Sequence, residues 1–165
     1  MGIHQLKLQV VPKSFIDNPP RKFVPAIELQ EGIEPWKVSP PPSEGFLLAL
    51  RKMLPIEKSW GETEEYVSGG NWQSKIRIWW TEGQLESIEF NFSPVANEWA
   101  LMRYFLKIVR QEDLLLIDSQ SGHVLQPDDE IVKVHFGQSR SSRFLVSPEE
   151  VILAASEPKL PPGAL

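Results

Sequence analysis

Cysteine is absent from the 165-residue chain, and its absence excludes several kinds of site at once. There can be no disulfide, no thiolate nucleophile and none of the cysteine-based structural zinc sites. Stability must therefore come from a hydrophobic core, and hydrophobic residues make up 41% of the chain, enough to build one. A chain without disulfides is compatible with a reducing compartment, so we expect a cytoplasmic protein.

Long hydrophobic runs are missing as well. Apolar runs such as Leu114–Ile117 are only a few residues long, whereas a membrane-spanning helix needs roughly 20 residues. The N-terminal residues Met1–Leu6 also lack the charged start and the following apolar stretch of a signal peptide. We therefore expect neither a membrane partner nor export.

Positive charge is in deficit: Lys and Arg total 17, Asp and Glu total 22, and the net charge is −5. A phosphate backbone repels such a balance, so we expect no nucleic-acid partner. A mildly acidic surface favours solubility, and it suits a partner protein with a basic surface.

Standard catalytic motifs are missing too. The sequence contains no Gly-x-Ser-x-Gly elbow, no phosphate-binding loop and no dinucleotide fingerprint. Its three histidines, His4, His123 and His135, form no closely spaced metal-binding pair. The sequence therefore predicts no catalytic residue, no cofactor and no metal site. One alternative remains, in which Asp118 and His123 face each other across a hairpin turn as orienter and base.

Length and proline content predict the organisation of the chain. A length of 165 residues fits a single domain, 1–165. Residues 34–42 include the run Pro40-Pro41-Pro42 and are expected to form an extended, stiff connector. A docking ligand for an aromatic groove is the alternative for this segment. Residues 158–165 contain three prolines and are expected to form a loose tail.

The clearest structural prediction is a β-hairpin over residues 74–92. Hydrophobic residues alternate with polar ones on both sides of a glycine-containing turn at Thr81–Gln84. Trp79 and Trp80 fall on opposite faces of the first strand, so either one tryptophan is exposed or both faces of the sheet are covered. Further strands are predicted at 6–10, 23–29, 113–118 and 123–125.

Helical spacing of apolar residues, together with capping residues, predicts the helices. Ser43 can cap the first of them, and Ser147-Pro148 is a typical start for the last. In 128–137 a helical pattern competes with strand alternation, and 60–67 mixes acidic residues with strand formers. We expect an α+β fold whose mostly antiparallel sheet is built on the hairpin, with three to four helices at 44–54, 94–110, 148–155 and, in the helical alternative, 128–137.

Residues 85–155 resemble a known protein family. After the second hairpin strand and a helix come Gln111–Asp118, a turn at Gly122, the run Val124–Pro127, and then Arg143–Val146 followed by Ser147-Pro148-Glu149-Glu150. This order is similar to that of small bacterial immunity proteins of polymorphic toxin systems. The resemblance implies an α+β, non-enzymatic protein that binds a toxin. It covers less than half of the chain and carries over no site residue.

An immunity protein of this kind is expected to occlude its partner with acidic and aromatic side chains. One segment supplies such residues, and we predict that they contact a toxin with a basic surface: Glu62, Glu64, Glu65, Tyr66, Trp79, Glu82, Glu86 and Glu89. Two other functions stay open. One is an enzyme or small-ligand-binding protein whose site combines Asp118 and His123 with Trp79, and the other is an accessory structural subunit.

Overall fold

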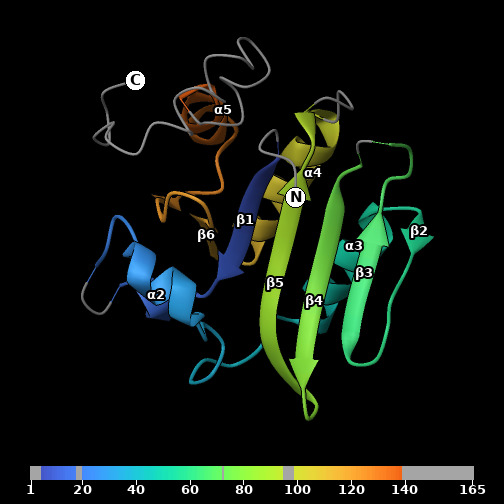
Figure 1. The fold of residues 1–165 in the computed structure, drawn as a ribbon, viewed down its shortest axis with the longest axis horizontal. Coiled ribbons are helices and arrows are strands. Elements are labelled where there is room, and N and C mark those ends of the chain that lie inside the picture. Colours follow the sequence, from blue (N-terminus) through green and yellow to red (C-terminus); the bar gives the residue numbers. More distant parts are fainter. Residues whose placement is uncertain (1–4, 18–19, 72, 95–98, 139–165) are drawn as a thin grey trace.

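The computed structural model describes residues 5–17, 20–71, 73–94 and 99–138. Within them, seven strands form one sheet in the order β2-β3-β4-β5-β1-β6-β7, and helices lie on both of its faces (Figure 1). Every pairing of neighbouring strands is antiparallel, so the predicted α+β fold with an antiparallel sheet is confirmed. Along the chain the elements are β1 (Leu6–Val11), α1 (Lys13–Ile16), α2 (Ala26–Glu31), α3 (Glu44–Met53), β2 (Ile56–Glu57), β3 (Thr63–Val67), β4 (Lys75–Thr81), β5 (Gln84–Phe92), α4 (Trp99–Gln111), β6 (Leu115–Asp118), β7 (Val124–Leu125) and α5 (Asp129–Gly137).

The predicted hairpin is confirmed as β4 and β5. Its two-residue turn is made by Glu82 and Gly83, which have positive φ angles of 51° and 78°. Two consecutive residues in this left-handed region match the twist of the flanking strands. The register shifts between Trp79 and Trp80, and Glu86 is the extra residue of the resulting β-bulge. The turn and the bulge together fix the directions in which side chains project at this end of the sheet.

The main hydrophobic core lies between one face of the sheet and helices α3, α4 and α5. Alternate strand residues such as Ile78 and Phe90 are fully buried there, as the sequence alternation predicts. The ring centroids of Phe90 in β5 and Phe105 in α4 are 4.5 Å apart. Helix α3 begins where it is predicted, because the Ser43 side chain accepts a hydrogen bond from the Phe46 N–H.

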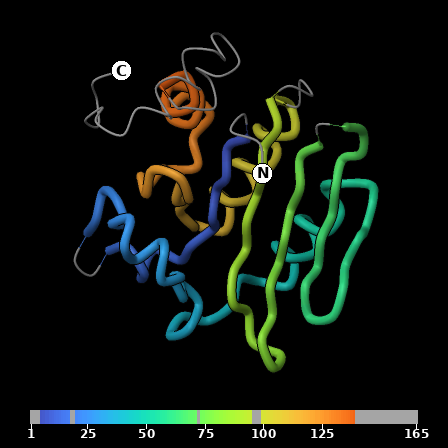
Figure 2. The backbone as a smooth tube through the Cα atoms, viewed as in Figure 1, coloured from blue at the N-terminus to red at the C-terminus, as the bar shows by residue number. Residues whose placement is uncertain are grey.

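The opposite face of the sheet is only partly covered. A second, smaller core joins Val11 and Ile117 of the sheet to residues of the α1–α2 segment, among them Ile16. Figure 1 shows α2 over this side, whereas β3, β4 and β5 have no described helix on that face. The chain then crosses to α3 on the other face through residues 32–43 (Figure 2). On the uncovered face, the outward side chains Arg77 and Trp79 of β4 are partly exposed.

The strand predicted at 23–29 is wrong. Residues 26–31 form helix α2, and only Phe23 makes an isolated bridge, to His123. The sequence pattern places Pro25 inside an edge strand, whereas the structure places it at the N-cap of the helix. Proline is tolerated there because the first turn of a helix does not use its backbone N–H groups.

The structure also settles two segments with competing patterns. Thr63–Val67 is a strand, β3. Residues 129–137 are a helix, α5, because the Asp128 carboxylate caps it by accepting from the N–H groups of Glu130 and Ile131. Helix α4 confirms the helix predicted at 94–110 over its described part. The predicted helix 148–155 and tail 158–165 lie outside the described residues.

The proline-rich segment 34–42 contains neither helix nor strand. Trp36 is nevertheless buried, and its indole Nε1–H donates to the Val10 carbonyl oxygen at 3.3 Å. This indole therefore fastens the segment to the end of β1 while the chain passes from one face of the sheet to the other.

Candidate functional site

The eight side chains predicted to contact a partner do not form one surface. Strands β3 and β4 place alternate residues on opposite faces of the sheet, so neighbours in the sequence separate. The structure divides the eight among three places: Glu64 and Tyr66 on the face covered by α3 and α4, Glu65, Trp79 and Glu89 on the opposite face, and Glu62, Glu82 and Glu86 at the turns of one end of the sheet.

Glu64 is the centre of a hydrogen-bonded cluster that joins α3 to the sheet. Its Oε1 accepts from the Arg51 Nε–H at 2.6 Å and from the Tyr66 hydroxyl at 2.8 Å. Its Oε2 accepts from Arg51 Nη2 at 3.0 Å and from the Trp80 indole N–H at 2.6 Å. Every lone-pair direction of this carboxylate is occupied within the protein, so Glu64 is not available to a partner.

The same contacts shift two pKa values in opposite directions. Burial raises the pKa of Glu64, but hydrogen bonds from Arg51, Trp80 and Tyr66 outweigh it and hold the value at about 2. Burial and the neighbouring Glu64 carboxylate raise the pKa of Tyr66 to about 12. At neutral pH the carboxylate is therefore ionised and the phenol is protonated, as the hydrogen bond between them requires.

The carboxylates on the opposite face are also paired. Glu65 is 6% exposed and binds the Arg77 guanidinium, its direct neighbour on β4. Glu89 is 8% exposed and lies 3.9 Å from Lys7 Nζ. Cross-strand ion pairs of this kind stabilise a sheet. We therefore assign Glu65 and Glu89 to the stability of the fold.

Three of the eight residues, Glu62, Glu82 and Glu86, are exposed and lie together. The backbones of Trp60 and Thr63 exchange hydrogen bonds of 2.9 and 2.8 Å, which close a tight turn before β3. Trp80 N–H donates to the Glu62 carbonyl oxygen at 3.2 Å, and Glu82 N–H donates to the Glu62 carboxylate at 3.0 Å. This turn and the β4–β5 turn are thereby held side by side at one end of the sheet (Figure 1).

Two tryptophans flank these carboxylates. Trp60 is 53% exposed, and Trp79 is partly exposed on the uncovered face of the sheet. Both lie beside Thr63, which bridges to Trp60 and pairs with Trp79. Sequence reasoning missed Trp60, although the following Gly61 marks a turn and turns lie at the surface. We call the surface made by Trp60, Glu62, Trp79, Glu82 and Glu86 the acidic end.

A hollow of about 340 Å³ adjoins the acidic end. It is lined by the β4–β5 turn, including Glu82 and Glu86, and by Glu34 and Lys37 from the segment that follows α2. Lys37 forms an ion pair with Glu34, in which Nζ lies 3.0 Å from the carboxylate Oε2. The hollow thus has an acidic lining and room for a side chain of a partner.

A second polar cluster surrounds Asp118, which is 2% exposed. Its Oδ2 accepts from His135 Nε2 at 2.6 Å and from the Ser121 hydroxyl at 3.0 Å, and its Oδ1 accepts from the Gln120 N–H at 2.9 Å. The Ser121 Oγ also lies 2.9 Å from His123 Nδ1. Burial raises the pKa of Asp118, but the bonds from His135, Gln120 and Ser121 outweigh it and lower the value. The carboxylate therefore fastens α5 to the β6–β7 turn.

This geometry only partly matches the site predicted from Asp118, His123 and Trp79. Asp118 and His123 are joined through Ser121, and His135, which the sequence did not connect to them, lies closer. Trp79 does not join them, because β5 and β1 separate β4 from β6 and Trp79 projects from the other face. Among the described residues, no group of three His, Asp or Glu side chains is placed to hold a metal ion.

Replacing Asp118 by asparagine is expected to loosen α5. A hydrogen bond to a charged group contributes roughly 1.5–3 kcal/mol, and the amide weakens the bond to His135. Because the pKa of Asp118 is lowered from 3.8, this stabilisation is present above pH 3.8 and is lost as the pH falls further. Native-state hydrogen exchange at pH 7 should show amides of α5 exchanging roughly tenfold faster.

The matched control is Asp129→Asn, on the same helix. Asp129 forms an i,i+4 ion pair with Lys133, at 3.2 Å, and such pairs contribute roughly 0.3–0.5 kcal/mol. Exchange across α5 should then change by less than roughly threefold. Equal acceleration by the two substitutions would show that the buried pair is not what holds the helix.

Neither protein-family models nor curated proteins nor solved structures match this chain. The resemblance of residues 85–155 to immunity proteins therefore stays a prediction. None of the described helices has the length and apolar character that crossing a membrane requires.

Proposed function

We propose that the chain is a non-enzymatic protein-binding domain and that the acidic end contacts its partner. One observation carries the proposal: of the eight predicted contact residues, the exposed carboxylates Glu62, Glu82 and Glu86 gather beside exposed Trp60. The Glu86 carboxylate accepts from the Thr81 hydroxyl and the Glu62 carboxylate accepts from the Glu82 N–H, so these two side chains lose little freedom on binding. Tryptophan is enriched among the residues that dominate protein interfaces.

The charge of the acidic end specifies the chemistry of the partner. Exposed carboxylates attract a basic surface and raise the rate of encounter with it. In the more specific form of the proposal, the partner is a bacterial toxin and the chain is an immunity protein that occludes its active surface. The resemblance of residues 85–155 to immunity proteins supports this form, and so does the acidic charge.

Charge reversal of Glu62, Glu82 and Glu86 to lysine tests the proposal. All three side chains are exposed, so the triple variant should fold, and losing the hydrogen bond from the Glu82 N–H to Glu62 should cost about 0.5–1.5 kcal/mol. Affinity capture with the tagged full chain, followed by quantitative mass spectrometry, should recover a basic protein with the wild type. We expect its recovery to fall at least about tenfold with the variant, since like charges across an interface oppose binding.

The control is a second triple variant with the same change of charge, Asp17→Lys, Glu31→Lys and Glu44→Lys. These side chains are exposed but lie outside the acidic end. The control should retain the partner. Equal recovery with both triple variants and the wild type would contradict the assignment of the surface.

The immunity form has its own test. The captured partner is expressed in a bacterium alone, with the wild-type chain, or with the triple variant of the acidic end. Growth should be inhibited by the partner alone, restored by the wild type and not restored by the variant. A captured partner that does not inhibit growth would exclude the immunity form and leave the binding function standing.

The Asp118 cluster favours a second candidate function, a small-ligand or catalytic site at His123 and His135. The specific observation is that the two rings lie 5.3 Å apart above a buried, ionised carboxylate, which is an arrangement suited to proton transfer. Fragment screening by NMR tests it through the histidine side-chain signals. A screen in which no fragment shifts the His123 and His135 signals would count against it.

A further inference from the structure

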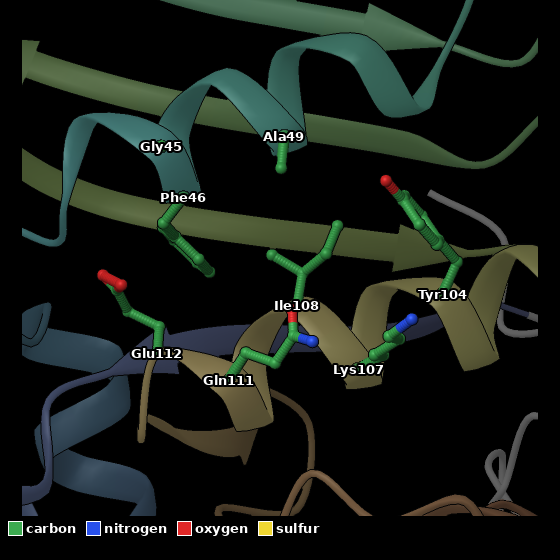
Figure 3. A pocket seen from close by; sticks show the side chains of 8 residues that line it. All are labelled: Gly45, Phe46, Ala49, Tyr104, Lys107, Ile108, Gln111 and Glu112. Carbon is green, nitrogen blue, oxygen red and sulfur yellow. The ribbon is translucent and has the colours of Figure 1, made fainter.

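A groove runs between α3 and α4, with the strands of the sheet behind the two helices (Figure 3). Its volume is about 250 Å³. Phe46, Ala49 and Ile108 form an apolar floor, and Figure 3 shows the Phe46 and Ile108 side chains pointing into the space between the helices. Glu112 closes one end, because its carboxylate accepts from the Ser43 N–H at 2.7 Å and from the Ser43 hydroxyl at 2.8 Å.

The α4 side of this groove is basic. Helix α4 carries three cations, Arg103, Lys107 and Arg110, all exposed, and no acidic residue. Lys107 lines the groove, and Arg103 lies on the same helix face one turn away. Neither of these two cations forms an ion pair within the part of the chain that the structure describes. In a chain with a net charge of −5, this is a local reversal of sign.

We infer that the α3–α4 groove binds an acidic segment of a partner protein that carries an apolar anchor side chain. The anchor packs over Phe46, Ala49 and Ile108, and its own apolar surface is thereby removed from water. Carboxylates beside the anchor pair with Arg103 and Lys107. Charge complementarity selects this occupant, because a basic segment would face two unpaired cations at the rim.

This surface goes beyond the proposed function of the acidic end. The acidic end lies on the turns of β3, β4 and β5 and attracts basic groups, whereas the groove lies on the outer side of the helices and attracts acidic ones. One chain therefore offers two surfaces of opposite charge, and each is testable without the other.

Fluorescence anisotropy with two labelled helical peptides tests the inference on the full chain. The first peptide carries two leucines four residues apart among glutamates, and the second carries alanine in place of both leucines at the same charge. The first peptide should bind saturably at physiological salt. The second should bind at least about tenfold more weakly, which is the effect of losing the buried anchor.

Variants locate the binding site of the first peptide. Lys107→Glu reverses the charge at the rim of the groove, and Ala49→Leu fills the space above its apolar floor. Each substitution should weaken binding at least about tenfold. Lys22→Glu makes the same change of charge at an exposed lysine beside β7 and should leave binding unchanged.

Several results would overturn the inference. They are equal binding of the two peptides, no saturable binding of the first, or weakening by Lys22→Glu as strong as by Lys107→Glu. A further contrary result has two parts: a single-stranded oligonucleotide competes fully with the first peptide, and Ala49→Leu has no effect on binding. Together they would show that the surface attracts any polyanion and has no site for an apolar anchor.

Discussion

Gly122→Ala is expected to lower the free energy of unfolding by at least about 2 kcal/mol. Gly122 has a φ of +79°, a conformation that costs a residue with a side chain roughly 1–2 kcal/mol. A Cβ atom there would stand 2.1 Å from the Val24 carbonyl oxygen, a backbone atom that cannot rotate away. Relief requires the segment around Val24 to move away from the β6–β7 turn, which breaks the 2.7 Å hydrogen bond from the Val24 N–H to the Gly122 carbonyl oxygen.

Urea unfolding at pH 7 measures this change, with Gly137→Ala as the matched control. Gly137 lies in α5, its added Cβ would meet no atom within 4 Å, and alanine favours a helix. The control should raise the free energy of unfolding by about 0.5 kcal/mol. Loss of less than about 0.5 kcal/mol with Gly122→Ala would show that residues 22–24 do not pack against the β6–β7 turn as described.

Glu64→Ala is expected to lower the free energy of unfolding by about 3 kcal/mol. The substitution leaves the Trp80 indole N–H, the Tyr66 hydroxyl and the Arg51 guanidinium without their shared acceptor. Each partly buried donor that loses its partner costs roughly 1–3 kcal/mol, less where water can reach it. This carboxylate supplies the ion pair between α3 and β3, beside the apolar packing of α3 on the sheet.

The pH dependence gives a second readout for Glu64. Its pKa is lowered from 4.5 to about 2, so its stabilisation is present above pH 4.5 and is lost as the pH falls through 2. Glu64→Gln should remove this part of the acid destabilisation. Glu86→Ala, at an exposed carboxylate, is the control and should change stability by less than about 0.5 kcal/mol. Similar effects of Glu64→Ala and Glu86→Ala would contradict the structural role of Glu64.

Local patterns predicted the hairpin and α3 because their causes are local. Alternation over β4 and β5 follows from one buried face, and Gly83 at the turn marks where the two strands meet. The cap of α3 is set by Ser43 alone. Helix α2 was missed because Pro25 is compatible with an edge strand and with a helix start, and only the packing of the segment against β6 and β7 decides between them.

The candidate site was harder to predict because it depends on pairing across strands. The eight predicted residues were grouped by nearness in the sequence, yet strand alternation sends Glu64 and Glu65 to opposite faces, where Arg51 and Arg77 engage them. Nothing local to either residue indicates those partners. The contact between Asp118 and His135 likewise requires α5 to fold back on the sheet.

Hydrogen–deuterium exchange of the complex with the captured partner tests the central claim most directly. The acidic end should be protected on binding, which would appear as slower exchange of backbone amides in residues 60–63 and 81–86. The same experiment with the Glu62→Lys, Glu82→Lys and Glu86→Lys variant should show no protection there. Protection of the wild type confined to other segments, with 60–63 and 81–86 exchanging as in the free protein, would contradict the account.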